Sequence, residues 1–569
     1  MKDASRVAAS SSNARAEDGL DPAGVPSAGW QYMAYGAVFS VFLALRVFVW
    51  SRTRMVEDHD SLGYIAIVGQ FANRGLGFLS ELGPTAAPLY PLLSSLVAPI
   101  TSSSEQAVRL GSLLASVALF FAVLKIGNKL GGFLVAMLSV TILTFNPNHI
   151  PFSVSVLSEP MYLAFVFWGI WLTLSYTERP KATKAFGAGL MFSLAFLTRA
   201  EGFLYVLAIP LLLLVYFYWP PRDRAVMPRA SRDLPAFLLG FALLAAPQIW
   251  RVSSEVGGFA INGRQILMQV IEPGDKTAAA ATKMGLDYDP HQTNMSYLMS
   301  HPEARQRRMA GRGLVNLERA RKFAREFDSL QYRQIGRLLG PLGVAFFALG
   351  CAALLVTGQR RTAFLVIGLL ATMLAGPLLH NVSVMRHILV VAPLAFVVEG
   401  LGIAWFAAQL VNSNGRWQTV ASVGLATMLI AATARPLWQA LRPPTSTNDY
   451  SLQDLQAPAR LITGIAAEEG LSPPRIAAHK GFLGYHIGAE TLGIPHAGYD
   501  AVVRYLRFHG ADFLYLEYRF RRPTRRAPFW NRFEAGDYAQ DFDLLYTGTT
   551  DRDGHPVELF RLRRLGKGE

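Results

Sequence analysis

The stretch QYMAYGAVFSVFLALRVFVW, residues 31–50, is twenty residues long and carries one charge, Arg46. A helix of about twenty residues is about 30 Å long, which matches the hydrocarbon core of a bilayer. Apolar runs of similar length recur along the chain. The sequence therefore predicts a polytopic α-helical membrane protein.

The composition supports this class of protein. The chain has 569 residues, of which 51% are hydrophobic and only 17% are charged, and its mean hydropathy is +0.27. A soluble multidomain protein is less apolar than this. The single cysteine, Cys351, excludes an intrachain disulfide.

Apolar runs of roughly 17 to 24 residues predict about eleven membrane spans. They are 31–50, 105–126, 131–150, 158–176, 183–198, 203–219, 234–251, 337–357, 361–379, 385–408 and 417–438. The run PLYPLLSSLVAPI at 88–100 has thirteen residues and three prolines. It is short for a crossing and predicts a helix in or near the membrane interface; if it crossed, the parity of the spans would change.

The distribution of Lys and Arg predicts which loops face the cytoplasm, because these residues stay inside in short loops. With eleven spans and an inner N-terminus, the inner loops hold Lys125, Lys129, Arg179, Lys181, Lys184, Arg222, Arg224, Arg229, Arg232, Arg360, Arg361 and Arg416. The short outer loops hold only Arg199 and Arg386, although Arg52 and Arg54 follow the first span on its outer side. We therefore expect the loop 51–104, the loop 252–336 and the C-terminal part to lie outside the cytoplasm.

The chain is expected to have three parts. Residues 1–29 are rich in Ser, Ala, Asp and Gly and predict a disordered cytoplasmic tail. Residues 30–442 form the transmembrane domain, and residues 443–569 form a small α/β domain. In that last part, 459–470 and 501–510 predict helices, 475–480 and 511–520 predict strands, and 543–562 predicts a hairpin turning at Asp553-Gly554.

The loop after the first span reads VEDHDSLGY, residues 56–64, and places Glu57, Asp58 and Asp60 around His59. A carboxylate held at the membrane boundary near Tyr64 and Tyr90 can accept a proton from an incoming hydroxyl, which is the work of a general base. The alternative is a set of interfacial charges in water.

Two short outer turns carry further charges. Glu159 begins a span, where an acid also stabilises the helix dipole, and LTRAEGF places Arg199 and Glu201 between two spans. Such a pair is either a structural ion pair or faces a polar cavity.

Basic residues mark two other outer segments. His380, Arg386 and His387 lie at the mouth of a span, where an arginine fork suits a phosphate; the alternative is a snorkelling headgroup contact. Residues 300–338 are basic, with Leu317, Phe323 and Phe327 at near-helical spacing, and predict a helix on an anionic membrane surface or a solvated helix.

The order of these features is similar to a known superfamily. The chain has a D-x-x-x-Y loop, an APLYP run, a turn with SEP, an LTRAEG turn, a long outer loop, an R-H turn and a trailing soluble domain. This order, from about residue 31 to 560, resembles the GT-C superfamily of glycosyltransferases, and most closely the family-39 type that includes protein O-mannosyltransferases and the lipid A aminoarabinose transferase. Many relatives have D-E where this chain has Asp60-Ser61, and P-P-L-Y where it has Ala87-Pro88-Leu89-Tyr90.

The resemblance implies a function. The donor would be a polyprenyl-phosphate sugar, the acceptor a hydroxyl on a lipid, glycan or protein, and the transfer inverting. The catalytic base would be Asp60, with Glu57 and Asp58 as alternatives. The donor and its phosphate would contact residues chosen from Arg386, His387, His380, Arg199, Glu201, Tyr64, Tyr90 and Glu159. No cofactor is required for a single leaving phosphate, although residues 57–60 could hold a divalent cation.

Other readings remain. A secondary transporter would keep ionisable groups near the membrane midplane and often shows repeated halves, whereas no repeat is evident here. A polymerase or ligase of lipid-linked polysaccharide, or a non-enzymatic scaffold, is also compatible. The C-terminal part lacks G-x-G-x-x-G and G-x-x-x-x-G-K, so no nucleotide ligand is expected there. No nucleic acid partner is expected either. We expect the bacterial inner (plasma) membrane as the location, with membrane lipids as partners.

Overall fold

The computed structural model describes most of the chain. The described residues are 27–53, 59–82, 86–218, 227–256, 259–261, 317–357, 359–379, 388–411, 415–441, 452–494, 499–518, 527–550 and 554–563. The predicted tail 1–29 lies almost wholly outside them, as does the boundary predicted near residue 442.

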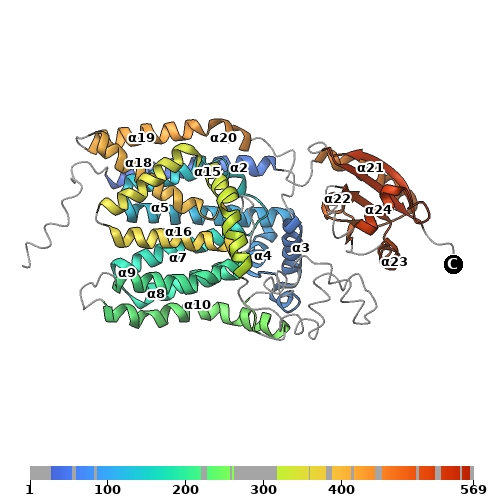
Figure 1. Ribbon diagram of the computed structural model, residues 1–569, viewed down its shortest axis with the longest axis horizontal. Helices are drawn as coiled ribbons and strands as arrows, with labels where there is room; N and C mark the ends of the chain where they lie inside the picture. The colour runs from blue at the N-terminus through green and yellow to red at the C-terminus, as the bar shows by residue number, and fades with distance from the viewer. Residues whose placement is uncertain are drawn as a thin grey trace, which may run out of the picture.

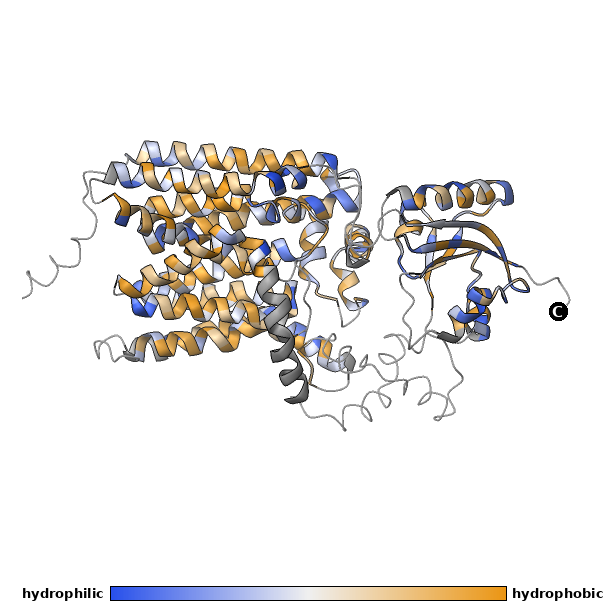
Figure 2. Cartoon of the chain, turned by 45° about the horizontal axis from the view of Figure 1, so that its top comes forward, coloured by the Kyte–Doolittle hydropathy of each residue, from blue (hydrophilic) through white to orange (hydrophobic). Residues whose placement is uncertain are grey.

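Long apolar helices form a bundle whose axes run side by side (Figure 1). They are α2 (Ala28–Arg52), α5 (Ser104–Phe145), α7 (Glu159–Glu178), α8 (Ala182–Thr198), α9 (Leu204–Tyr218), α10 (Met227–Val256), α16 (Arg360–Leu379), α18 (Ala392–Leu410), α19 (Gly415–Ala432) and the apolar second part of α15 (Leu317–Val356). Helix α15 bends at Gly340, and its part before the bend runs across the axes of the bundle (Figure 1). Figure 2 shows that hydrophobic residues dominate this bundle. Every predicted span overlaps one of these helices, which confirms the polytopic helical class.

The number of spans stays a prediction. Within the described residues, six helices are long and apolar enough to cross a membrane, or up to seven if α19 and the bent α20 (Ala434–Ala440) count as one. The run 88–100 forms only the short helix α4 (Leu89–Ser95) and the 3-10 turn η3 (Ala98–Ile100). Seven helical residues extend about 10 Å, so α4 does not cross a bilayer.

Helix α5 is a hairpin of two antiparallel arms. Straight, its 42 residues would extend about 63 Å, twice the bilayer core. Gly131 and Gly132 leave the helical conformation, and Gly132 has a φ of 72° that other residues rarely adopt. The arms touch beyond this turn, since a Cβ on Gly127 would lie 2.8 Å from Ala136 Cα. The two spans predicted at 105–126 and 131–150 overlap these arms, although the second arm ends at Phe145, before residues 146–150.

The charge in the first span, Arg46, is fully buried and anchors α2 to the end of α5. Its Nη2 donates to Leu143 O at 3.0 Å, and its Nη1 donates to Thr144 O at 3.2 Å. The guanidinium also stacks over Phe42, 3.5 Å from the ring centroid. Carbonyls at a helix C-terminus attract a cation, so the charge is satisfied without a carboxylate.

Helix α3 (His59–Arg74) and α4 lie at the end of the bundle nearest the C-terminal domain (Figure 1). Ser61, Val68 and Phe71 are buried, whereas Gly63, Ala66 and Gln70 are exposed. This spacing of buried residues is that of an amphipathic helix lying on the bundle.

The C-terminal domain contains a five-stranded sheet with the order β2-β1-β3-β5-β4. Strands β1 (Arg475–Ala478), β2 (Glu490–Gly493) and β3 (Phe513–Glu517) are parallel, and β4 (Phe542–Thr549) and β5 (Pro556–Leu562) are antiparallel to their partners. In β3, Phe513 and Tyr515 face one core, and Leu514 and Leu516 face the other. Both faces of the sheet are therefore covered, which is typical of an α/β domain.

Four helices cover the two faces. Helices α21 (Leu452–Glu469) and α22 (Phe482–Ile487) lie on one, and α23 (Tyr499–Phe508) and α24 (Ala527–Ala535) lie on the other. The hairpin predicted at 543–562 is β4–β5, and Gly554 in its turn has a φ of 63°. The sequence analysis did not predict α22, α24 or β2.

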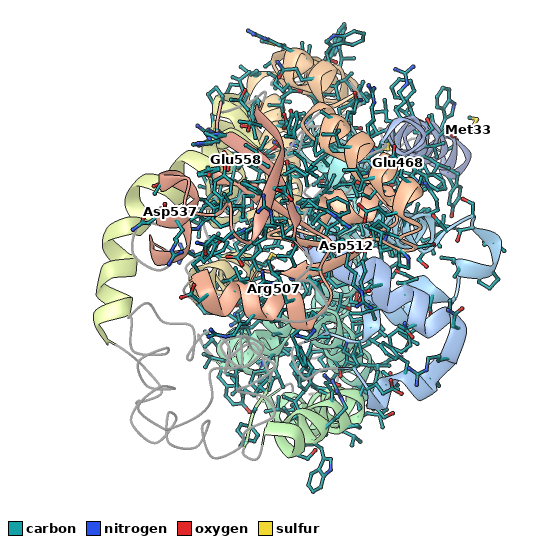
Figure 3. All side chains as sticks on the ribbon, turned by 90° about the vertical axis from the view of Figure 1, so that its right-hand side faces the viewer. Met33, Glu468, Arg507, Asp512, Asp537 and Glu558 are labelled. Carbon is teal, nitrogen blue, oxygen red and sulfur yellow. The ribbon has the colours of Figure 1, made fainter. Side chains whose placement is uncertain are left out.

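Figure 3 looks from the C-terminal domain toward the bundle, and its labels Arg507, Asp512 and Glu558 mark this domain.

Candidate functional site

The described part of the site lies where α3, α4 and the turns before α7 and α9 meet. Ser61 donates a hydrogen bond to Val156 O at 2.8 Å, and the Tyr64 hydroxyl donates to Ser158 Oγ at 3.1 Å. These bonds join α3 to the turn that ends in S-E-P. Asp60 is the second residue of α3, about one helical turn before Tyr64.

Tyr90 supports Tyr64 from α4. The two rings meet edge to face with centroids 4.9 Å apart. The Tyr90 hydroxyl lies 2.9 Å from Ser112 Oγ, and Ser112 donates to Leu157 O at 3.4 Å. Edge-to-face aromatic pairs stabilise by about 0.5–1.5 kcal/mol beyond their buried area, so Tyr64 is held by both its ring and its hydroxyl.

An ion-pair cluster lies next to Ser158. Arg199 follows the end of α8 and contacts two carboxylates: its Nη1 is 2.7 Å from Glu159 Oε1, and its Nη2 donates to Glu201 Oε1 at 2.9 Å. The side chains of Glu159, Arg199 and Glu201 are 1%, 9% and 15% exposed. Buried charges of this kind persist only when they are paired.

This pairing bears on the expected role of Arg199. Burial alone would lower the pKa of its guanidinium, but attraction by Glu159 and Glu201 raises that pKa well above its usual value. Arg199 also donates a long bond of 3.4 Å to Ser158 Oγ. The geometry favours a positioning role for Arg199, and phosphate binding by this residue stays a prediction.

The structure thus brings five predicted site residues into one network: Tyr64, Tyr90, Glu159, Arg199 and Glu201. Glu57, Asp58, His380, Arg386 and His387 lie outside the described residues, and the side chain of Asp60 does too. Their roles stay predictions. Within the described residues no group of three or more His, Cys, Asp or Glu could hold a metal ion; the side chains of residues 57–60 are not among those described.

Sequence reasoning did not single out Ser158, which receives hydrogen bonds from both Tyr64 and Arg199. The signal was present, because Ser158 is the first residue of the S-E-P turn. It also missed Glu399, a fully buried acid within α18, for which the structure shows no hydrogen bond to Oε1. Glu399 lines a small pocket with Phe145, Leu339 and Thr433 between α5, α15, α18 and α19.

The chain is an integral membrane protein with the fold of the GT-C superfamily of glycosyltransferases, as the sequence resemblance predicted. A model of the family described as "Dolichyl-phosphate-mannose-protein mannosyltransferase" matches residues 85–250, which include Tyr90, the S-E-P turn and Arg199. No curated protein matches the sequence.

Two solved structures illustrate the likeness. The oligosaccharyltransferase of Archaeoglobus fulgidus in the apo form is 11% identical, with a TM-score of 0.56 over 86% of this chain and 70% of that one. ArnT from Cupriavidus metallidurans in the apo state is 12% identical, with a TM-score of 0.53 over 94% of this chain and 98% of that one. At this identity the likeness establishes the fold.

Proposed function

We propose that the protein is a membrane glycosyltransferase that moves a sugar from a polyprenyl-phosphate donor to an acceptor hydroxyl on the extracytoplasmic face. The observation that carries the proposal is the docking of α3, the helix that contains Asp60, onto the Ser158–Arg199 network within a GT-C fold. The matched family is named for dolichyl-phosphate-mannose. The oligosaccharyltransferase AglB from Archaeoglobus fulgidus, similar in fold with a TM-score of 0.50, has been solved in complex with an inhibitory peptide and a dolichol-phosphate.

In the proposed reaction, the Asp60 carboxylate accepts the proton of the acceptor hydroxyl. The acceptor oxygen then forms a bond to the anomeric carbon from the face opposite the phosphate, and the bond between that carbon and the phosphate oxygen breaks. The polyprenyl phosphate leaves with the electron pair, and the configuration of the sugar inverts. Arg386 and His387 would neutralise the phosphate charge as it develops.

The test replaces Asp60 by Asn. Asparagine keeps the shape but cannot accept a proton at neutral pH, so turnover of a polyprenyl-phosphate sugar should fall about 10²-fold or more. Glu57→Gln and Asp58→Asn are the matched variants. Near-normal turnover of folded Asp60→Asn, with loss in one of the other two, would transfer the role of base to that residue.

The donor phosphate is tested separately. Arg386→Lys keeps the charge but loses the bidentate fork and should weaken polyprenyl-phosphate binding moderately, whereas Arg386→Ala should weaken it severely. Binding by the Ala variant that equals wild-type binding would remove Arg386 from the site.

The predicted location is tested with a reporter active only in the cytoplasm and fused after Glu569. Its silence is expected, and its activity would place the C-terminal domain inside.

A further inference from the structure

Helix α3 lies between two hydrophobic cores. Ile65 packs against the core of the helical bundle and also against the core of the C-terminal domain that contains α21 and α22. Leu62, three residues earlier on α3, packs against that second core as well. The helix that contains Asp60 is therefore in contact with both domains.

The contact with α22 is close. Gly481 precedes α22, and a Cβ built at Gly481 would lie 3.1 Å from Leu62 Cδ1. Contacts of this length between carbon atoms are tighter than the optimum of about 3.5–4.0 Å. An added Cβ at position 481 therefore requires the Leu62 side chain to shift by a few tenths of an ångström, and a leucine there would extend further into the contact with α3.

A polar bond joins the same two domains beside this contact. The Tyr485 hydroxyl, on α22, donates to Glu105 Oε2 at 2.5 Å. Glu105 is the second residue of α5 and also accepts a hydrogen bond from Arg109 Nε at 2.9 Å. The buried Arg109 donates to Val154 O at 3.2 Å. Val154 lies two residues before Val156, the acceptor for Ser61. The C-terminal domain thus reaches the turn on which α3 rests.

The two sets of contacts fix different aspects of α3. Ser61 and Tyr64 bond to the bundle, while Leu62 and Ile65 contact the C-terminal domain. The first set of contacts holds one side of this sixteen-residue helix, and the second set holds another. Contacts on two sides determine both its depth and its rotation.

We propose that the segment Gly481–Tyr485 of the C-terminal domain is a positioning element of the transfer site, and that it holds α3, and therefore Asp60, against the bundle through Leu62 and Ile65. The proposal rests on the function proposed above. It assigns the C-terminal domain a part in catalysis that is independent of any contact it makes with an acceptor. Gly481, Tyr485, Leu62 and Ile65 act on the reaction through α3 and touch no reacting atom.

The first experiment measures α3 without reference to activity. In the full-length protein, Gly481→Leu should accelerate hydrogen exchange of the α3 backbone amides by about tenfold or more, because local opening becomes easier. The matched control is Gly464→Leu on α21, where an added Cβ meets no atom within 4 Å. Unchanged exchange in α3 of Gly481→Leu would overturn the proposal, as would equal acceleration in both variants.

The second experiment asks whether the displacement affects turnover. Misplacement of a reacting group by about 1 Å can lower the rate by about 10²-fold, so Gly481→Leu should lower kcat by about tenfold or more while its affinity for polyprenyl phosphate stays unchanged. Adding Leu62→Ala makes room for the new side chain and should restore kcat to within about threefold, a coupling expected only between residues in contact. A loss that Leu62→Ala does not rescue would contradict a positioning role.

A cross-link provides an independent geometric check. Leu62→Cys and Gly481→Cys, in a chain whose single native cysteine is replaced by Cys351→Ser, should be joined by a short bismaleimide. Failure to cross-link would overturn the assigned contact. If no polyprenyl-phosphate sugar supports turnover by the unaltered chain, the proposed function fails, while hydrogen exchange and cross-linking still decide whether α22 holds α3.

Discussion

Arg46 and Arg199 both contact the segment between α5 and α7, and their charges are satisfied in different ways. Arg46 contacts Ser153 Oγ and the carbonyls of Leu143 and Thr144, whereas Arg199 contacts the carboxylates of Glu159 and Glu201. The guanidinium of Arg46 holds backbone segments in place through their carbonyl oxygens, whereas the guanidinium of Arg199 holds two acidic side chains in place. The first arrangement builds the fold, and the second holds charged groups beside Tyr64 and Ser158, where the site is expected.

The largest effect in this comparison is expected for Arg199→Ala. It leaves two nearly buried carboxylates without their cation, and breaking a buried ion pair in this way costs about 3–5 kcal/mol. Turnover should also fall, by about 10²-fold or more, because the turn that receives Tyr64 loses its anchor. Unfolding midpoints and turnover in detergent measure both effects. Arg179→Ala, on an exposed arginine, is the control, and similar values for the two variants would contradict the assignment.

Arg46→Ala should separate folding from catalysis. It leaves the carbonyls of Leu143 and Thr144 without a donor, at a cost of about 1–3 kcal/mol. The free energy of unfolding should fall, while turnover per folded molecule stays within about twofold of wild type. A selective loss of turnover at unchanged stability would show that Arg46 belongs to the site and would remove the distinction between the two arginines.

A smaller effect is expected from pH, through His149 beside Arg46. Burial, and then the charge of Arg46, lower the pKa of His149 well below its usual value. The unfolded chain binds a proton at this residue below about pH 6.5, but the folded protein does not. The contribution of neutral His149 to stability is therefore fully present above that pH. As the pH decreases below it, the free energy of unfolding falls by up to about 1.4 kcal/mol per pH unit.

This pH dependence is measured from unfolding midpoints between about pH 7.5 and 5. His149→Gln should flatten the curve, whereas His555→Gln, on an exposed histidine, should not. If stability falls with pH equally steeply in wild type and in His149→Gln, groups other than His149 cause the pH dependence.

The smallest effect is expected for Tyr64→Phe. The ring keeps its contact with Tyr90, and the bond to Ser158 is lost, which costs about 1 kcal/mol. Turnover should fall a few-fold, because α3 is attached less tightly to the bundle. Tyr32→Phe, on a largely exposed ring, should have no effect. A loss as large as that of Arg199→Ala would indicate that the Tyr64 hydroxyl itself takes part in the reaction.

The sequence predicted the helical class, the apolar runs and the α/β tail because these depend on local hydrophobicity and turn residues. It did not predict the partners of Arg46, since the C-terminal carbonyls of α5 lie about a hundred residues further along the chain. It also left open whether Glu159 served only the helix dipole. That question depends on Arg199, forty residues later, and is answered by packing between α7 and α8 rather than by any local pattern.

The short helix α22 escaped prediction for a related reason. Its six residues contain no long periodic pattern, and its role depends on Leu62 and Glu105, which lie hundreds of residues earlier. The ordered set of motifs nevertheless brought together Tyr64, Tyr90, Arg199 and both acids. These residues were recognisable as a group before their contacts were known.

The glycine turn within α5 constrains how the protein is made. Neither arm can bury its inner face until the other has entered the bilayer, because Gly127 and Ala136 lie against each other across the turn. The arms are thus suited to leave the insertion machinery as a helical hairpin, with Lys125 and Lys129 retained near its closed end. A substitution at Gly132 would then act during synthesis as well, as a defect of membrane insertion in addition to the strain that it places on the folded turn.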